Sequence, residues 1–338
     1  MARLQARGIL LGLMLISFCA PVFSGRHAGT ALPSIRVRGN EYVLLEDFAA
    51  RYDLKVTWIR KGMSVRLQKE NTVIELAANS RKMIWNGLSI YLSEAPSTYR
   101  DTLALSLSDV HSTAEPLLQS HLLAERGKVR LIAIDPGHGG IDSGTQNSRF
   151  KFREKTLALD LALRLKVALE RLGYRAILTR ASDKYVGLEK RSAMARRAGA
   201  DLLLSLHFNA LRSNPDVHGI ETYAFTPAGQ RSTATGVHHP ASEKSQMSNR
   251  YDQWNLVLAA FMQQNLVTDL GAVDHGVKRA RFVVLRDLQC PGVLIEGGFL
   301  SNDAEAKKIS TTLYREKIAR AIARGVQSYV VALESTST

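Results

Sequence analysis

The feature that most constrains the fold is a regular alternation of short apolar runs with amphipathic helical stretches, which begins at Val129. Apolar residues recur at helical spacing in "TLALDLALRLKVALERLG", and this predicted helix ends at Gly173. Strands that alternate with helices are typical of an α/β fold, in which a mostly parallel central sheet carries helices on both faces. Strands are predicted at 129–135, 174–180, 200–210, 219–225, 281–285 and 292–300. Helices are predicted at 156–173, 187–199, 254–271 and 312–334.

A smaller α+β unit precedes this pattern. The stretch "LEDFAARYDL" has helical spacing, and the residues after it alternate apolar and polar side chains between turn residues, which predicts short antiparallel strands. The predicted organisation is a signal peptide at 1–24, a small α+β domain at 25–110, a linker at 111–128, a larger α/β domain at 129–333 and a tail at 334–338.

The first 24 residues have the order of a secretory signal peptide. Two arginines precede the apolar run "ILLGLMLISFCAPVF", and cleavage is expected after Ser24. An uncleaved anchor is the alternative, although the run is short for a membrane-spanning helix. We therefore expect an exported protein of the periplasm, cell envelope or extracellular space, with no membrane span after cleavage. Cleavage leaves Cys290 alone, which predicts a buried, unreactive thiol and no internal disulfide.

The chain is strongly basic, with a formal net charge of +14. No basic run is interleaved with aromatic residues as single-strand nucleic-acid binders require, so nucleic acid is not an expected partner. An anionic cell-surface polymer or membrane surface fits this charge, and a solvated basic surface without a specific partner is the alternative.

Polar residues with metal-binding chemistry lie where the predicted strands end. His138 follows the first strand in "AIDPGHGG", His207 ends "LLLSLH", and Glu154 lies at the start of the first long helix. Two imidazoles and one carboxylate form the ligand set of hydrolytic zinc sites that keep a position open for water, and each ring is expected to have an orienting acceptor. Glu296 follows "GVLI" and could move a proton between water and a leaving amine.

Each of these residues has an ordinary interpretation when it is considered alone. A single histidine after a strand is commonly a loop or core residue, Glu154 could be a first-turn helix acid, and Glu296 could be an ion-pair partner. Asp135 could be a metal ligand, but a role in forming the loop or in orienting a ligand is the preferred interpretation. Glycines near these residues are expected to leave room for substrate; they are Gly139, Gly140, Gly297 and Gly298.

The polar stretch from Thr226 to Asp252 has little periodicity. It contains His238 and His239, and it is either a solvated loop or a lid that faces the substrate. His111 and His121, further upstream, show no ligand spacing.

Several separated motifs together resemble one family. They are "IAIDPGHGGIDSG", "REKTLALDLALRLKVALERLGYRAILTR", "LEKRSAMARRAGADLLLSLHFNA", "GIETY" and "VLRDLQCPGVLIEGGFLSNDAE". In this order they resemble the zinc-dependent N-acetylmuramoyl-L-alanine amidases of bacteria (amidase type 3), cell-wall hydrolases, from Val129 to Leu333. Residues 25–110 more loosely resemble the copper-amine-oxidase-like N-terminal domains of secreted wall proteins, which implies no copper.

The resemblance implies a reaction and roles for four residues. His138, Glu154 and His207 would bind one Zn²⁺ per chain, and Glu296 would be the catalytic acid and base. The substrate would be peptidoglycan, cleaved at the amide between N-acetylmuramic acid and the L-alanine of the stem peptide. A monomer is expected, and no regulator is identified.

Two departures from the family pattern bear on this site. The family's "HANA" reads "HFNA" here, which is expected to place the bulk of Phe208 beside the metal. Some relatives carry an inhibitory helix over the zinc, but the 226–252 stretch is less apolar than such a plug, so no activator is expected. Asn209 could orient the substrate or a ligand, or form a turn, and Arg191 is expected to support packing or a salt bridge.

Two other functions remain as alternatives. One is a zinc peptidase that cuts within the stem peptide, and the other is a non-catalytic protein that binds the cell wall. The N-terminal domain could bind the wall or be purely structural.

Overall fold

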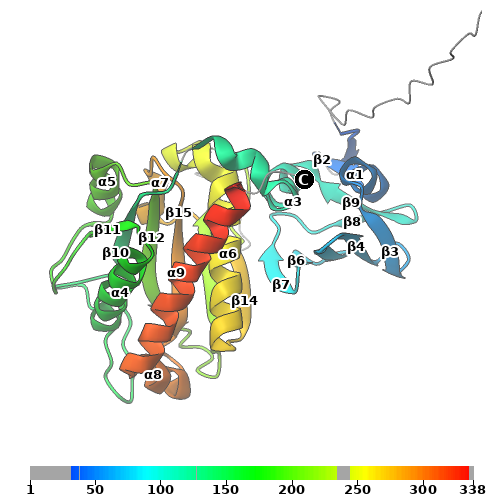
Figure 1. The fold of residues 1–338 in the computed structure, drawn as a ribbon. Helices are drawn as coiled ribbons and strands as arrows, with labels where there is room; N and C mark the ends of the chain where they lie inside the picture. Colours follow the sequence, from blue (N-terminus) through cyan, green and yellow to red (C-terminus); the bar gives the residue numbers. More distant parts are fainter. Residues whose placement is uncertain (1–31, 38, 127, 234–243, 335–338) are drawn as a thin grey trace, which may run out of the picture. The chain divides into compact units, whose positions relative to one another are not determined.

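The computed structural model describes residues 32–37, 39–126, 128–233 and 244–334 (Figure 1). The predicted signal peptide, and His238 and His239 of the 226–252 stretch, lie outside the described residues. Among the helices that are described, none combines the length and the apolar character needed to cross a bilayer.

A mostly parallel sheet forms the centre of the larger α/β part, as predicted. Its strands follow the order β11-β10-β12-β15-β13-β14. The first four are parallel to one another, β13 is antiparallel to β15, and β14 is parallel to β13. Their bounds are β10 Leu131–Pro136, β11 Arg175–Leu178, β12 Leu202–Asn209, β13 Ile220–Phe225, β14 Asp274–Ala280 and β15 Gly292–Phe299.

Helices cover both faces of this sheet (Figure 1). Three long helices pack side by side on one face: α4 Glu154–Arg171, α6 Asp252–Leu270 and α9 Thr312–Glu334. The other face carries α5 Leu188–Ala198 and the short α7 Val283–Arg286, while α8 Asp303–Ser310 follows β15. Strand residues alternate between two cores because successive side chains point to opposite faces. Leu204 and Leu206 belong to the core under the long helices, and Leu203 belongs to the core under α5 and α7.

One predicted strand is wrong. Residues 281–285 do not form a strand; their apolar part forms α7 instead, and the strand is β14, immediately before it. A five-residue apolar run does not distinguish a strand from a buried helical turn. The sequence did not indicate a strand at β14 because this segment contains the charged residues Lys278 and Arg279. Their side chains have buried hydrogen-bond partners only in the folded chain.

The N-terminal part combines one helix with short strands, as predicted. Helix α1 begins after Leu44 and buries Phe48 and Tyr52, and the strands after it pair antiparallel from β3 to β7. A four-stranded sheet has the order β1-β2-β9-β8. Bounds are β1 Ile35–Val37, β2 Asn40–Leu44, α1 Leu45–Tyr52, β3 Lys55–Arg60, β4 Ser64–Lys69, β5 Thr72–Ala77, β6 Lys82–Trp85, β7 Leu88–Tyr91, β8 Ser97–Tyr99 and β9 Thr102–Ser106.

The segment after β9 consists of short helical turns. They are α2 Leu107–Asp109, a π-helical turn at Val110–Ala114, α3 Glu115–Leu118 and a 3-10 helix at Ser120–Arg126. Val110, Ala114 and Leu117 are buried in the core, so this segment packs against the residues around it.

Candidate metal centre

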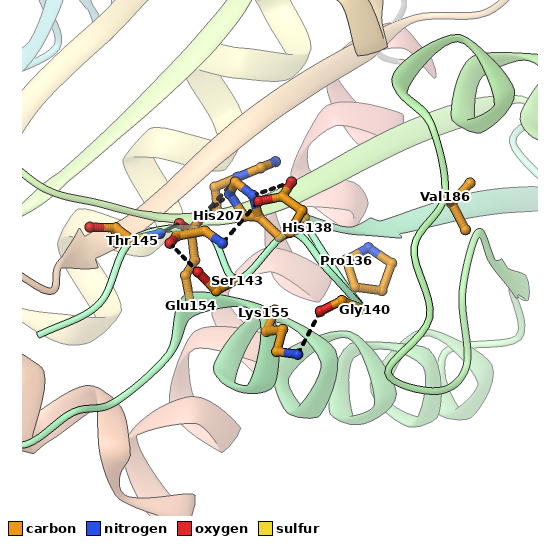
Figure 2. A network of polar contacts seen from close by, with 12 residues as sticks. Pro136, His138, Gly140, Ser143, Thr145, Glu154, Lys155, Val186 and His207 are labelled. Atoms are coloured by element: carbon orange, nitrogen blue, oxygen red, sulfur yellow. Dashed lines mark hydrogen bonds and ion pairs between the residues drawn. The ribbon is translucent and has the colours of Figure 1, made fainter.

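Three side chains meet beyond the carboxyl ends of the central strands. His138 follows β10, Glu154 is the first residue of α4, and His207 lies near the end of β12. One donor atom of each lies within 4.8 Å of the other two (Figure 2). The Oε1 atom of Glu154 lies 3.0 Å from Nε2 of His138 and 2.9 Å from Nδ1 of His207. The structure therefore brings together the three ligands that the sequence predicts.

Two buried arginines hold the loop that carries His138. The backbone of His138 is left-handed, with φ of 60°, which is costly for a residue with a side chain. Arg191 donates to the carbonyl oxygens of His138 and Pro136, both at 2.7 Å. Arg180 donates to the carbonyls of Pro136 at 3.0 Å and of Gly137 at 2.6 Å. These bonds compensate for the unfavourable backbone conformation and fix the direction of the imidazole.

Asp135 anchors the same loop and is not one of the clustered ligands. Its side chain is fully buried and accepts hydrogen bonds from Arg191 at 2.9 Å, from Ser205 at 2.8 Å and from Thr179. Arg191 thus forms a salt bridge, one of the two roles expected for it. Asp135 is its partner and helps to hold the loop that carries His138.

Asp142, which the sequence analysis did not single out, orients the His138 ring. Its Oδ2 atom lies 2.8 Å from Nδ1 of His138, which leaves Nε2 turned towards Glu154. The other oxygen accepts the N–H of Gly144 at 3.1 Å. A carboxylate on the second ring nitrogen is the usual way to fix a ligand histidine. The available signal was Asp142 in the "IDSG" segment, an acidic residue four positions beyond His138.

The Glu154 carboxylate accepts hydrogen bonds from backbone N–H groups as well as from the two histidines. Its Oε2 atom accepts the N–H of Thr145 at 2.8 Å, and Oε1 accepts the N–H of Phe208 at 3.1 Å. Burial acts to raise the pKa of Glu154, but hydrogen bonds from His138 and His207 lower it to about 2. The side chain is therefore ionised, which is the form that binds a metal.

Phe208 lines the same hollow as the clustered residues, and its backbone also contributes to the site. Its side chain is 1% exposed and belongs to the core under the long helices, while its backbone N–H holds Glu154.

Glu296 stands in a row of polar residues across three neighbouring strands. His207 of β12 pairs in register with Glu296 of β15, which pairs in register with Glu221 of β13. The Oε2 atom of Glu296 is shielded from solvent and accepts no hydrogen bond from any described residue. Burial raises the pKa of Glu296 well above its ordinary value, and the charges of Glu154 and Glu221 raise it further.

Glu221 is a second residue that the sequence analysis overlooked. Although its side chain is buried, it accepts hydrogen bonds from the hydroxyl of Tyr223 at 2.8 Å, from Asn209 and from Lys278. The Asn209 amide is thereby fixed between Glu221 and the N–H of Ala210. The acid in "GIETY" could have been noticed because it interrupts an apolar strand.

The three clustered residues and Glu296 line an open hollow of about 480 Å³. One wall is apolar and comes from α5, α7 and the segments beside them; it includes Leu188, Phe282, Val283, Val284 and Leu294. Cys290 is buried and does not line this hollow, as expected for an unreactive thiol.

The glycines at 139 and 140 have a different role from the one predicted. A Cβ on Gly139 would lie 2.3 Å from the carbonyl oxygen of Lys184, and one on Gly140 would lie 2.6 Å from the N atom of Tyr185. These glycines therefore allow two loops to pack together, rather than making room for substrate. Lys155 fastens the packed loop by donating to the carbonyl of Gly140 at 2.8 Å (Figure 2).

Gly137 is the glycine that the ligand geometry requires. A Cβ at this position would lie 2.3 Å from Cε1 of His207. We expect Gly137→Ala to displace the His207 ring and weaken metal binding by about 10- to 100-fold, the range found when the support of a ligand is lost. Competition with a chromophoric chelator measures this change. Gly187→Ala is the matched control, since a Cβ there meets nothing within 4 Å; equal affinities for both variants would contradict the steric requirement.

The residues present fit a divalent metal ion. Three nitrogen and oxygen donors converge on one point, and a shielded carboxylate atom without a hydrogen bond stands beside them. Imidazole and carboxylate ligands together are typical of zinc and related first-row metals. A mostly parallel sheet with this cluster beyond its strand ends defines an α/β protein with a metal site of the hydrolytic type.

Comparisons with known proteins identify the family. The N-acetylmuramoyl-L-alanine amidase model matches residues 132–328, and the copper amine oxidase N-terminal domain model matches residues 25–115. The chain belongs to the N-acetylmuramoyl-L-alanine amidase family of cell-wall hydrolases.

Individual relatives agree with this assignment. The N-acetylmuramoyl-L-alanine amidase AmiA of Salmonella typhimurium is 33% identical over 230 residues, a match that covers 60% of this chain and 77% of the relative. LytC of Bacillus subtilis, with the same enzyme name, is 35% identical over 198 residues, which covers 59% of this chain and only 35% of LytC. A solved amidase structure from Clostridium difficile 630 has a TM-score of 0.50 and 30% identity, and covers 60% of this chain and 97% of its own.

Proposed function

We propose that this protein cleaves the amide between N-acetylmuramic acid and the L-alanine of the stem peptide in peptidoglycan, with one Zn²⁺ held by His138, Glu154 and His207. The observation that carries the proposal is the convergence of these three donors in the same hollow as Glu296, whose Oε2 atom has no hydrogen-bond partner among the described residues. Zinc at such a site polarises a carbonyl group and lowers the pKa of water towards about 7.

Glu296 is proposed as the group that moves the proton. Its free Oε2 atom accepts a proton from the attacking water as the water oxygen bonds to the lactyl carbonyl carbon. The carbon–nitrogen bond then breaks, and Glu296 returns the proton to the departing alanine nitrogen. The products are a muramoyl lactyl carboxylate and a peptide with a free amino terminus. Burial and neighbouring negative charge raise the pKa of Glu296, so the carboxylate is a stronger base towards the proton of the attacking water.

The proposal extends to the location of the enzyme. Residues 1–24 would be removed on export, and the mature chain would act in the cell envelope as a monomer. The match of residues 25–115 to a domain model separate from the amidase model supports an N-terminal domain before the catalytic one. N-terminal sequencing of the exported protein, with Gly25 expected as the first residue, tests the cleavage.

Digestion of purified sacculi tests the reaction. The protein is expected to release stem peptides that begin with L-alanine, and to leave glycan strands whose N-acetylmuramic acid residues carry free lactyl carboxylates. A chelator should stop the release, and added Zn²⁺ should restore it. Mass spectrometry of the products separates the alternatives: fragments cut within the stem peptide would indicate a peptidase. Binding to sacculi without any release would indicate a non-catalytic wall protein.

A further inference from the structure

The metal hollow continues into a second hollow of different character. The second hollow has a volume of about 430 Å³ and adjoins the first at Thr145, Ala210 and Arg212, which line both. Thr145 donates its N–H to the metal-cluster residue Glu154, so the junction begins one hydrogen bond from the metal cluster. The metal cluster lies in the first hollow, and the second hollow adjoins it at these three residues.

The two hollows differ in the charged residues that line them. The metal hollow has the apolar wall described above, on the side of α5 and α7. The residues that line the second hollow include Gln146, Ser148 and Lys151, and no acidic residue of the described chain is among them. A substrate with one uncharged arm and one negatively charged arm would fit this pair of surfaces in a single direction.

Arg212 lies where the two hollows adjoin, and its positive charge is not paired with an acidic residue of the described chain. It is exposed, and it is the one Lys or Arg side chain of the described residues that lines the metal hollow. Within the described part of the chain, its guanidinium makes no hydrogen bond or ion pair with a neighbour. By contrast, Arg149 nearby is paired with Asp303. An unpartnered guanidinium beside a reaction centre is suited to bidentate binding of a carboxylate.

The loop that carries Arg212 is held in place. At its start, Leu211 donates its N–H to the Ser301 hydroxyl at 3.0 Å. At its end, Asn302 donates to the carbonyls of Pro215 at 3.1 Å and of Asp216 at 3.3 Å. Arg212 is thus presented from a loop fixed at both ends, so less conformational entropy is lost when it binds a ligand.

The two arms of the proposed substrate differ in charge in the same way. On the sugar side, the only carboxyl group of N-acetylmuramic acid is the lactyl group, which is consumed in the scissile amide. The peptide side carries free carboxylates. Consecutive α-carbons lie about 3.8 Å apart, so a carboxylate on the second residue falls within about 8 Å of the reacting bond.

We propose that Arg212 binds a carboxylate of the stem peptide close to the scissile bond, and so directs the peptide arm into the second hollow and the sugar arm along the apolar wall. This inference rests on the proposed amidase function and adds to it the determinant of substrate direction and charge preference. Amidation of that carboxylate would remove the preference, because an amide cannot form the charge-assisted pair.

A matched pair of synthetic muramoyl peptides tests the proposal. The two peptides differ only in whether the α-carboxyl group of the second residue is free or amidated. The native enzyme should prefer the free acid. Arg212→Gln should lower kcat/KM for the free acid about tenfold and change the amidated peptide little, and Arg212→Lys should retain part of the preference. Arg197→Gln is the control, since Arg197 is exposed on α5 and lines neither hollow.

Binding supplies a readout that does not depend on turnover. In a Glu296→Gln background, calorimetric titration should show weaker binding of the free acid, but not of the amidated peptide, when Arg212→Gln is added. Equal losses on both peptides, or no loss on either, would overturn the role of Arg212 while leaving the amidase function intact. A native enzyme that cleaves neither peptide at the lactyl amide would overturn the proposed function, and this inference with it.

Discussion

Glu296→Gln is expected to lower the rate of amide hydrolysis by about 10²- to 10⁴-fold, the contribution usual for a positioned general acid–base group. The substitution keeps the size and the hydrogen-bonding shape of the side chain but removes its capacity to accept and return a proton. Because the three clustered donors come from other residues, metal binding should remain. Rates with a soluble muramoyl peptide, together with elemental analysis of the purified variant, measure both effects.

The control for this prediction is Glu189→Gln on α5, whose side chain is 68% exposed and does not line the hollow. It should retain the native rate and the native zinc content. Two results would contradict the role given to Glu296. Hydrolysis at the native rate would show that another group moves the proton, and loss of the metal would show that Glu296 is a ligand.

The residues of the metal cluster could be predicted because each lies at the boundary of an element with a strong local pattern. His138 and His207 stand where apolar strands end, and Glu154 stands where an amphipathic helix begins. In a parallel sheet the carboxyl ends of the strands lie on one side of the sheet. The order of elements was therefore enough to predict that these side chains lie close together. The same reasoning recovered the two layers of helices and most of the strands.

Features that depend on pairing between distant segments could not be predicted in this way. Strand β14 carries charges whose partners lie elsewhere in the chain: Lys278 pairs with Glu221, 57 residues away. Glu221 itself comes beside Glu296 only through the antiparallel pairing of β13 with β15, which local periodicity does not specify. Asp142 is close to His138 in sequence, but its role depends on the left-handed backbone of His138, a conformation uncommon in a non-glycine residue.

Arg191→Met is expected to lower the free energy of unfolding of the metal-free protein by about 3–5 kcal/mol, because it leaves the buried Asp135 carboxylate without its charged partner. Both side chains are nearly inaccessible, with exposed fractions of 2% and 1%, so water cannot replace the guanidinium. The carbonyl of His138 also loses its donor, while the carbonyl of Pro136 keeps only the hydrogen bond from Arg180. Urea denaturation after treatment with a chelator measures the loss.

The control is Arg197→Met, the same substitution at an exposed position of the same helix, which should change stability by no more than about 0.5 kcal/mol. Adding Asp135→Asn to Arg191→Met should recover part of the loss, since the buried charge is then removed. Metal affinity should not recover, because the His138 carbonyl still lacks its hydrogen bond from Arg191. If Arg191→Met is no less stable than Arg197→Met, the ion pair does not stabilise the fold. If the double variant binds metal as the native protein does, Arg191 does not hold the His138 loop in its ligand geometry.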